Sequence, residues 1–205
     1  MHIEFLVEEA SCAALLRVLV PKLLGNAVEF NLHVFQGKQA LLASLPSRMK
    51  GYARWLPPDW RIVVLVDRDN DDCVSLKRKL NEAAAEAGLV TRTQCATGRR
   101  FQVLNRIAVE ELEAWFFGDV AAITAAYQRV PASLAARRGF RDPDAIAGGT
   151  WEKLEQVLQT AGYYKAGIPK IEVARMISPH LDPIRNRSRS FKTFCDALKD
   201  MAGRS

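Results

Sequence analysis

Apolar and polar positions divide the first 110 residues into short apolar runs, each followed by a segment of helical periodicity. Runs of this length, rich in Val, Ile, Leu and Phe, are typical of strands. The expected strands are 3–7, 27–35, 61–67, 89–95 and 101–109. The run at 61–67 is apolar on both faces, which indicates a central parallel strand covered by helices on each side.

Helical segments follow the apolar runs. The expected helices are 8–24 with a kink or break at Pro21, one or two turns within 37–56 interrupted by Pro46, 71–88, and a helix that begins directly at Glu110. Repeated alternation of strand and helix predicts a mostly parallel sheet flanked by helices, which is an α/β fold.

The pattern changes after about residue 130. A segment rich in turn formers, 137–149, separates the alternating part from three further helical segments at 150–161, 169–178 and 189–202. We therefore expect an α/β core over residues 1–130 and a helical C-terminal extension over 131–205 that packs on it. Trp115, Phe116 and Phe117 are expected in the core.

Composition adds limits to this picture. The chain has 205 residues, of which 49% are apolar and 25% charged, as in ordinary globular proteins. No apolar run approaches the roughly 20 residues that cross a bilayer. Glu4, Glu8 and Glu9 stand where a secretion signal would carry basic and then apolar residues. We expect a cytoplasmic protein, and four scattered cysteines without a CxxC argue against a zinc site.

The net charge of +6 is concentrated near the C-terminus, where residues 160–205 hold nine Lys or Arg against four Asp or Glu. Such a segment is compatible with a polyanion such as nucleic acid. The side chains that could bind phosphates are Lys165, Lys170, Arg175, Arg185, Arg187, Arg189 and Lys192, with Ser188 and Ser190 as hydroxyl donors. The alternative is that one of these serines caps the last helix and that the charges only face solvent.

Acidic residues follow three of the expected strands. They are Glu8 and Glu9, then Asp67 and Asp69, then Glu110 and Glu113, the last two at a spacing that shares one helix face. The carboxyl ends of parallel strands meet at one edge of a sheet, where ligands gather. Carboxylates that converge there without basic partners repel one another unless a cation such as Mg²⁺ or Mn²⁺ neutralises them. Asp71 and Asp72 are instead expected to begin the following helix.

Other phosphate chemistries fit less well. The chain lacks GxxxxGK[ST], which excludes a P-loop ATPase, and "EEASCA" stands where a dinucleotide fold has a glycine-rich turn. A response-regulator receiver also pairs acids after the first and third strands. It needs a Lys after the fifth strand, however, and this region offers only Arg106.

With these residues in view, the chain resembles the Toprim domains of topoisomerases, primases and overcoming-lysogenization-defect nucleases. Those domains carry a Glu after the first strand and a DxD after the third, which match Glu8 in "FLVEEAS" and Asp67 and Asp69 in "VLVDRDN". More closely, the chain is similar to a Toprim-like bacterial family named only as domain of unknown function 4276. The matching segments are "LVEEASCAALL", "VVLVDRDNDDC", "RIAVEELEAWFFGD", "YYKAGIPKIEVARMI" and "RNRSRSFKTFCDAL".

The resemblance implies a metal-dependent nuclease core, encoded beside a partner ATPase in mobile or phage-defence gene sets. Glu8, Asp67 and Asp69 would then be catalytic and bind Mg²⁺ or Mn²⁺, with Glu110 or Glu113 completing the ligand shell. The alternative is a non-catalytic subunit that binds nucleic acid or a partner protein, because no Lys or Tyr is obvious beside these acids. The choice between DNA and RNA and the oligomeric state stay open.

Overall fold

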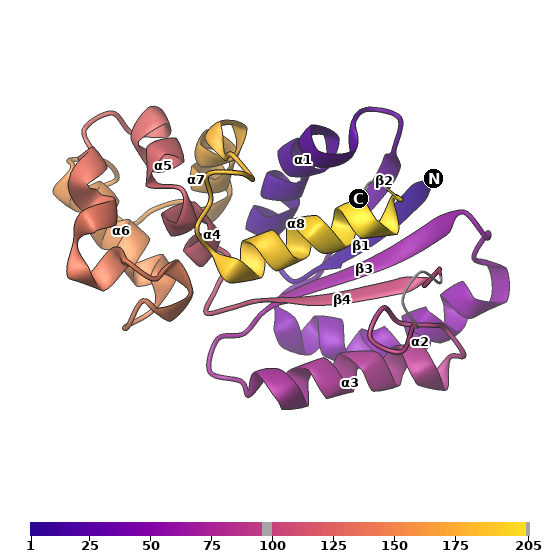
Figure 1. Ribbon diagram of the computed structural model, residues 1–205. Coiled ribbons are helices and arrows are strands. Elements are labelled where there is room, and N and C mark those ends of the chain that lie inside the picture. Colours follow the sequence, from indigo (N-terminus) through magenta and orange to yellow (C-terminus); the bar gives the residue numbers. More distant parts are fainter. Residues whose placement is uncertain (96–99, 204–205) are drawn as a thin grey trace.

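A four-stranded parallel sheet with helices on both faces forms the centre of the molecule in the computed structural model, which describes residues 1–95 and 100–203 (Figure 1). The strands are β1 (His2–Val7), β2 (Glu29–Val34), β3 (Trp60–Asp67) and β4 (Val103–Ala108). They lie in the order β2-β1-β3-β4, and all neighbours run parallel. The predicted α/β fold is confirmed.

The helices form two layers and a group beyond the carboxyl ends of the strands. Their bounds are α1 (Ala10–Leu24), α2 (Lys38–Trp55), α3 (Cys73–Glu86), α4 (Glu113–Gly118), α5 (Val120–Ala126), α6 (Thr150–Thr160), α7 (Lys170–Ile177) and α8 (Arg189–Met201), with short 3-10 helices η1 (Ala132–Ala136), η2 (Arg138–Phe140), η3 (Pro143–Ala145) and η4 (Ser178–His180). Figure 1 shows α1 and α8 on one side of the sheet, α2 and α3 on the other, and α4 to α7 beyond its carboxyl ends. Among the described residues, no helix is both long and apolar enough to span a bilayer.

Side chains of the central strands alternate between the two layers, as the period of two in a strand requires. On β3, Val63 and Leu65 join the cluster formed with α1 and α8, whereas Ile62, Val64 and Val66 join the cluster formed with α2 and α3. Both faces of β3 are therefore buried. This arrangement explains its unbroken apolar run, and it leaves polar residues only at the ends of the strand.

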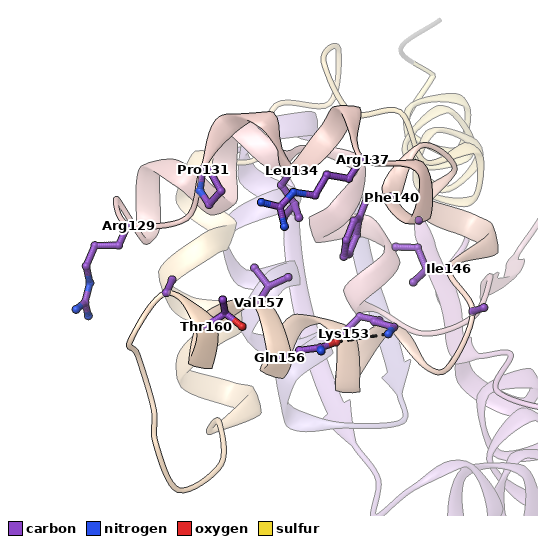
Figure 2. Close-up of a pocket in the computed structure, with 13 residues that line it drawn as sticks. Arg129, Pro131, Leu134, Arg137, Phe140, Ile146, Lys153, Gln156, Val157 and Thr160 are labelled. Carbon is purple, nitrogen blue, oxygen red and sulfur yellow. Dashed lines mark hydrogen bonds between the residues drawn. The ribbon is translucent and has the colours of Figure 1, made fainter.

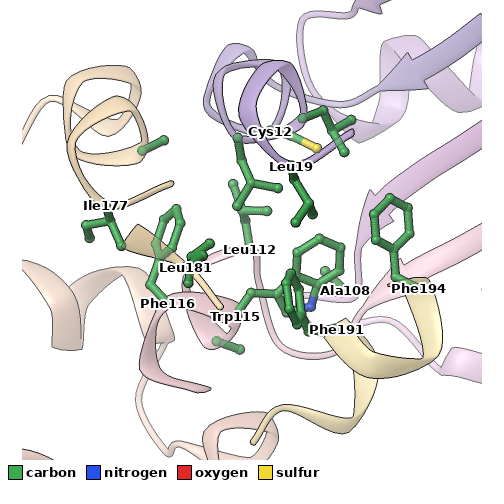
Figure 3. Packing of buried hydrophobic residues seen from close by; sticks show 14 of the residues in the cluster. Cys12, Leu19, Ala108, Leu112, Trp115, Phe116, Ile177, Leu181, Phe191 and Phe194 are labelled. Atoms are coloured by element: carbon green, nitrogen blue, oxygen red, sulfur yellow. The ribbon is translucent and has the colours of Figure 1, made fainter. Parts of the chain in front are cut away.

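The last helix, α8, is part of the layer that covers the sheet. Its Phe191 and Phe194 rings pack against Trp115, with centroid distances of 5.3 and 5.1 Å (Figure 3). The Trp115 indole Nε1 donates to Ser190 Oγ at 2.8 Å. Ser188 caps the helix by accepting from the Phe191 amide at 3.1 Å. The predictions of a capping serine and of a buried Trp115 are confirmed.

The predicted strand at 89–95 is wrong. Only Thr91 makes an isolated parallel bridge, with Val103 at the start of β4. The chain then turns away, because the amides of Gln94 and Cys95 donate to the Thr91 carbonyl at 3.1 and 3.0 Å. Side-chain bonds between Thr91 and Gln94 hold that turn and end the pairing after one residue.

Two prolines lie inside helices, although Pro46 was expected to interrupt its helix and Pro21 to kink or break one near its end. Pro46 lies within the continuous helix α2, which packs Leu41, Leu45 and Met49 against the sheet. Tertiary packing of this apolar face outweighs the roughly 3 kcal/mol that an internal proline costs. Pro21 likewise lies inside α1, whose last turn continues to Leu24.

The helix expected to begin at Glu110 begins three residues later and is split in two. Glu110 has a φ of 63° and lies in the loop after β4. The helix α4 starts at Glu113, and Asp119 separates it from α5 with an extended φ of −129°. Because Glu110 is not helical, the expected shared helix face of Glu110 and Glu113 is wrong.

Candidate functional site

The strand order reverses between β1 and β3, since the chain leaves β1 toward β2 on one side and later returns to β3 on the other. In open parallel sheets such a switch point is where ligands bind, outside the carboxyl ends of the strands. Glu8 directly follows β1 and Asp67 ends β3. The Asp67 amide donates to Glu8 Oε2 at 3.1 Å, so these two predicted residues lie side by side at the switch.

Two further predicted carboxylates lie near this pair, Asp69 in the loop after β3 and Glu113 at the start of α4. We call Glu8, Asp67, Asp69 and Glu113 the acidic edge. Burial raises the pKa of Asp67 well above its usual value, and the nearby carboxylates of Glu113 and Glu8 raise it further. The Asp67 carboxyl therefore lies within electrostatic reach of the other three carboxylates.

Glu113 and Glu8 are themselves poorly compensated for their burial. Glu113 is only 3% exposed, and burial raises its pKa to about 7, although the Lys170 ammonium offsets part of the shift. Burial also raises the pKa of Glu8, against the hydrogen bond from the Asp67 amide. Because the charged forms of these groups are disfavoured, the acidic edge gains stability from any added positive charge.

The loops at the acidic edge adopt a strained backbone. Asp69 and Glu110 have φ values of 48° and 63°, in the left-handed region that non-glycine residues rarely adopt. The Asp69 amide donates to the Glu110 carbonyl at 2.8 Å, and the Arg68 amide donates to Ala108 at 2.9 Å. The loops after β3 and β4 are thus bonded together. Such conformations, at about 1–3 kcal/mol each, concentrate at functional sites.

Lys38, at the start of α2, is the residue of this site that the sequence interpretation missed. Its ammonium lies 2.7 Å from Asp69 Oδ2 and 2.8 Å from Asp71 Oδ2, and it donates to the Arg68 carbonyl at 3.0 Å. Burial opposes its charge, yet the hydrogen bonds to Asp69 and Asp71 raise the pKa of Lys38. The expectation that the acids lack a nearby basic partner is therefore wrong.

An open pocket of about 370 Å³ lies beside Lys38. Its lining residues are Gln36, Gly37, Lys38, Gln39, Asp69, Asn70 and Asp71. The pocket thus joins the carboxyl end of β2 to the loop after β3. A signal for Lys38 existed in the sequence, because Gly37 and Lys38 directly follow an expected strand.

Glu110 lies near the acidic edge but is already paired. Its carboxylate accepts from the Arg68 guanidinium. Glu9 is paired more weakly, since Lys170 Nζ lies 3.5 Å from Glu9 Oε2. Asp72 caps α3 by accepting from the Ser75 amide at 2.8 Å, which confirms the predicted helix start.

Lys170 is the predicted basic residue that the fold brings to the acidic edge. It begins α7, which packs against α1, and its ammonium lies 4.8 Å from the centre of the Trp151 ring. Burial opposes its charge, but Glu113 and Glu9 raise the pKa of Lys170. A segment far along the chain therefore supplies a second cation to these acids.

The other predicted basic residues lie elsewhere. Arg185 makes two hydrogen bonds to the buried Asp119, at 2.6 and 2.7 Å, and Arg187 donates to the carbonyls of Phe140 and Arg141. Ser188 is fully buried, where its hydroxyl donates to Asp144 at 2.7 Å and caps α8. Lys165 and Arg189 are exposed. Within 1–95 and 100–203, no hydrogen bond or ion pair joins Lys165 or any of residues 185–189 to the acidic edge.

The donor chemistry of the acidic edge fits a hard divalent cation, because carboxylate oxygens are the ligands of Mg²⁺ and Mn²⁺. The buried Cys12 thiol nearby has a pKa raised well above its usual value by burial, so it stays protonated. The described part of the chain contains no group of three or more His, Cys, Asp and Glu side chains already arranged to hold an ion. Asp69 Oδ2 lies 2.7 Å from the Lys38 ammonium, and Glu8 Oε2 accepts from the Asp67 amide.

Comparison with known proteins adds one finding. No curated protein and no solved structure matches the chain. A family model described as domain of unknown function (DUF4276) matches residues 7–199. That match runs from the last residue of β1 into α8 and includes every residue of the acidic edge. The chain therefore belongs to the DUF4276 family.

Proposed function

We propose that the acidic edge binds Mg²⁺ or Mn²⁺ and hydrolyses phosphodiester bonds of a nucleic acid, as in the Toprim nucleases that the sequence resembles. One observation carries this proposal: carboxylates after β1, β3 and β4 gather where the strand order reverses, and there Glu113, Glu8 and Asp69 all raise the pKa of Asp67. A structural cluster without a ligand would gain from replacing them with neutral residues.

Glu8, Asp67, Asp69 and Glu113 are the residues that would hold the ion. A bound divalent cation would neutralise the phosphate charge and lower the pKa of an attacking water. Glu110 contributes less, because its carboxylate is committed to Arg68. Glu8 can alternatively serve as a general base, since its raised pKa brings proton uptake closer to neutral pH.

Lys38 and Lys170 have roles of their own in this proposal. When Asp69 turns toward an ion, the Lys38 ammonium loses one of its two carboxylate partners and can donate to a substrate phosphate. Lys170 lies on the α7 side and can bind a neighbouring phosphate of the same strand. The association with a partner ATPase in a mobile-element or phage-defence system stays a prediction from the resemblance.

Paired variants at the end of β3 and at the start of α3 test the proposal. Asp67→Asn removes a proposed ligand, whereas Asp72→Asn changes the same charge five residues later and keeps a helix-capping side chain. We expect Asp67→Asn to abolish Mn²⁺ binding by calorimetry and to reduce cleavage of DNA or RNA by at least about 100-fold. Asp72→Asn should leave both unchanged.

Failure of the proposal has a clear signature. If metal-dependent cleavage survives Asp67→Ala combined with Asp69→Ala, the acidic edge does not catalyse it. If Mn²⁺ does not bind to the wild-type protein near pH 8, the proposed divalent-cation site does not exist.

A second candidate function is a non-catalytic subunit that binds nucleic acid or a partner protein. It is favoured by Lys38, which already neutralises Asp69 and Asp71 as a cation would. The variant Lys38→Met separates the two. In a nuclease, Mn²⁺ affinity is kept or rises while cleavage falls; in a structural ion pair, Mn²⁺ does not bind and the variant only loses stability.

A further inference from the structure

A pocket separate from the acidic edge lies in the helical part of the molecule. It has a volume of about 540 Å³, is partly open to solvent and lies between α6 and the short helices η1 and η2 (Figure 2). One wall is a single face of α6, whose Lys153, Gln156, Val157 and Thr160 recur at the spacing of neighbouring turns. None of its lining residues belongs to the acidic edge.

The interior of this pocket is apolar and anchored in the core. Leu134 and Ile146 are 1% and 3% exposed, and Phe140 and Val157 are half-buried. The Phe140 ring packs against Phe117, with centroids 5.2 Å apart. This volume lies in the range of about 300–1,000 Å³ that is usual for small-molecule sites.

The charged side chains at the pocket are all basic: Arg129, Arg137 and Lys153, with no Asp or Glu among the lining residues. Arg129 is engaged outside, since it donates to the Gly162 carbonyl and stacks 4.1 Å from the Tyr163 ring. Figure 2 shows its side chain directed away from the pocket.

Arg137 and Lys153 are the two cations available to a ligand. Figure 2 shows the Arg137 side chain extending beside Leu134 over the pocket, and no described residue forms a hydrogen bond or ion pair with its guanidinium. Lys153 Nζ has only a long contact, 3.4 Å, with Gln156 Oε1. Arg137, which is exposed, and Lys153, which is partly buried, lie above an apolar floor without a carboxylate partner among the described residues, an arrangement that suits a negatively charged group attached to an apolar body.

We propose that this pocket binds a small organic anion with an aromatic or acyl body, such as an aryl phosphate or a fatty carboxylate. The body lies against Leu134, Ile146 and Val157, and the anionic group accepts from Arg137 and Lys153. The inference does not depend on the chemistry of the acidic edge, because the two sites share no residue.

The fluorescent probe anilinonaphthalene sulfonate has both parts of such a ligand and tests the pocket directly. We expect saturable one-to-one binding to the folded wild-type protein. Naphthyl phosphate and decanoate should each displace the probe and neutral naphthol should not, and the stronger competitor identifies a phosphate or a carboxylate ligand. Equal displacement by naphthol would overturn the proposed charge selectivity.

Variants locate the binding. Arg137→Gln combined with Lys153→Gln should weaken probe binding by at least about tenfold. The matched control Arg129→Gln, from the same rim but directed away, should change it by less than about twofold. Val157→Trp keeps the basic rim and fills the floor, and it should abolish binding. Unchanged affinity in the double variant would contradict the proposal.

A measurement on the unmodified protein covers the case in which a variant fails to fold. Titration of naphthyl phosphate into isotope-labelled wild-type protein should shift methyl resonances of Leu134, Ile146 and Val157 more than those of Leu6 or Val66 in the sheet. Shifts confined to other parts of the molecule, or no shift at a saturating concentration of naphthyl phosphate, would overturn the assignment.

Discussion

Glu4 and Glu113 are equally buried, each 3% exposed, yet their surroundings are opposite. Glu4, on β1, accepts hydrogen bonds from His2 at 2.6 Å, Asn31 at 2.9 Å and Tyr52 at 3.1 Å, and it is also bonded to His33. Burial alone would raise its pKa, but the bonds from His33, Asn31 and His2 lower it below the usual value.

Glu113 has no such set of donors, and its pKa rises to about 7. No hydrogen bond from another described residue reaches its carboxylate. The difference shows that burial does not decide what a carboxylate does; its partners do. A carboxylate whose donors are all provided stabilises the fold, whereas one left without them is available to a ligand.

The largest expected effect comes from replacing Glu4, the carboxylate that has a full set of hydrogen-bond donors. Glu4→Gln places an amide NH₂ among donors and should lower the free energy of unfolding by about 3–5 kcal/mol in urea denaturation. Glu29→Gln, at an exposed position of β2 opposite His2, is the control and should change it by less than about 0.5 kcal/mol. A loss below about 1 kcal/mol for Glu4→Gln would show that its network is not stabilising.

The same substitution at Glu113, Glu113→Gln, should raise the free energy of unfolding instead of lowering it. The raised pKa means that the folded state binds a proton more tightly than the unfolded state, so the ionised group destabilises the fold above the unfolded pKa of 4.5. Metal-free Glu113→Gln should therefore be more stable than wild type above pH 7, by up to about 3 kcal/mol.

That gain should shrink as the pH falls from about 7 toward 4.5, and vanish below it, because wild-type Glu113 is then protonated in both states. Urea denaturation of both proteins across this range measures the difference. A destabilised Glu113→Gln at high pH would mean that the carboxylate has a stabilising partner.

A divalent cation that binds at the acidic edge should stabilise the folded protein. Mn²⁺ at about 100 times its dissociation constant should raise the free energy of unfolding by about 2.7 kcal/mol. The gain should be smaller near pH 5.5 than near pH 8, because protons compete for Asp67 and Glu113. Thermal unfolding with and without Mn²⁺ measures this, and Asp67→Asn should abolish it. An equal gain at both pH values would point to a site outside the acidic edge.

The smallest effect is expected at Asp72, which lies between β3 and α3. Its carboxylate already accepts a hydrogen bond from the Ser75 amide. Asp72→Ala removes the cap of α3 and should lower the free energy of unfolding by about 1 kcal/mol, measured by urea denaturation. Mn²⁺ affinity should be unchanged. A loss of Mn²⁺ binding in this variant would extend the cation site to the helix start.

The pairing of Glu8 with Asp67 was predictable because it depends on one rule, that parallel strands end at one edge. The buried Trp115 and the caps at Asp72 and Ser188 were predictable for a similar reason, since each depends on local pattern. The two helix caps need no knowledge of which strands are neighbours, and the Glu8–Asp67 pairing needs only that β1 and β3 end at the same edge.

Lys38 was not predictable in this way, because its contact with Asp69 requires β2, β1 and β3 to be adjacent in that order. The pairing of Glu110 with Arg68 and its left-handed φ depend on the loops after β3 and β4 meeting. The segment at 89–95 has strand composition, but its own turn at Thr91 ends the pairing.

The helix α8 has a consequence for the synthesis of the chain. It is translated after every strand, yet its Phe191, Phe194 and Leu198 cover the same face of the sheet as α1. Until it leaves the ribosome, Trp115 and Leu104 of the nascent chain lack part of their cover. Products that stop before α8 should expose this apolar face and aggregate or attract chaperones, so the acidic edge is complete early while the fold that supports it closes last.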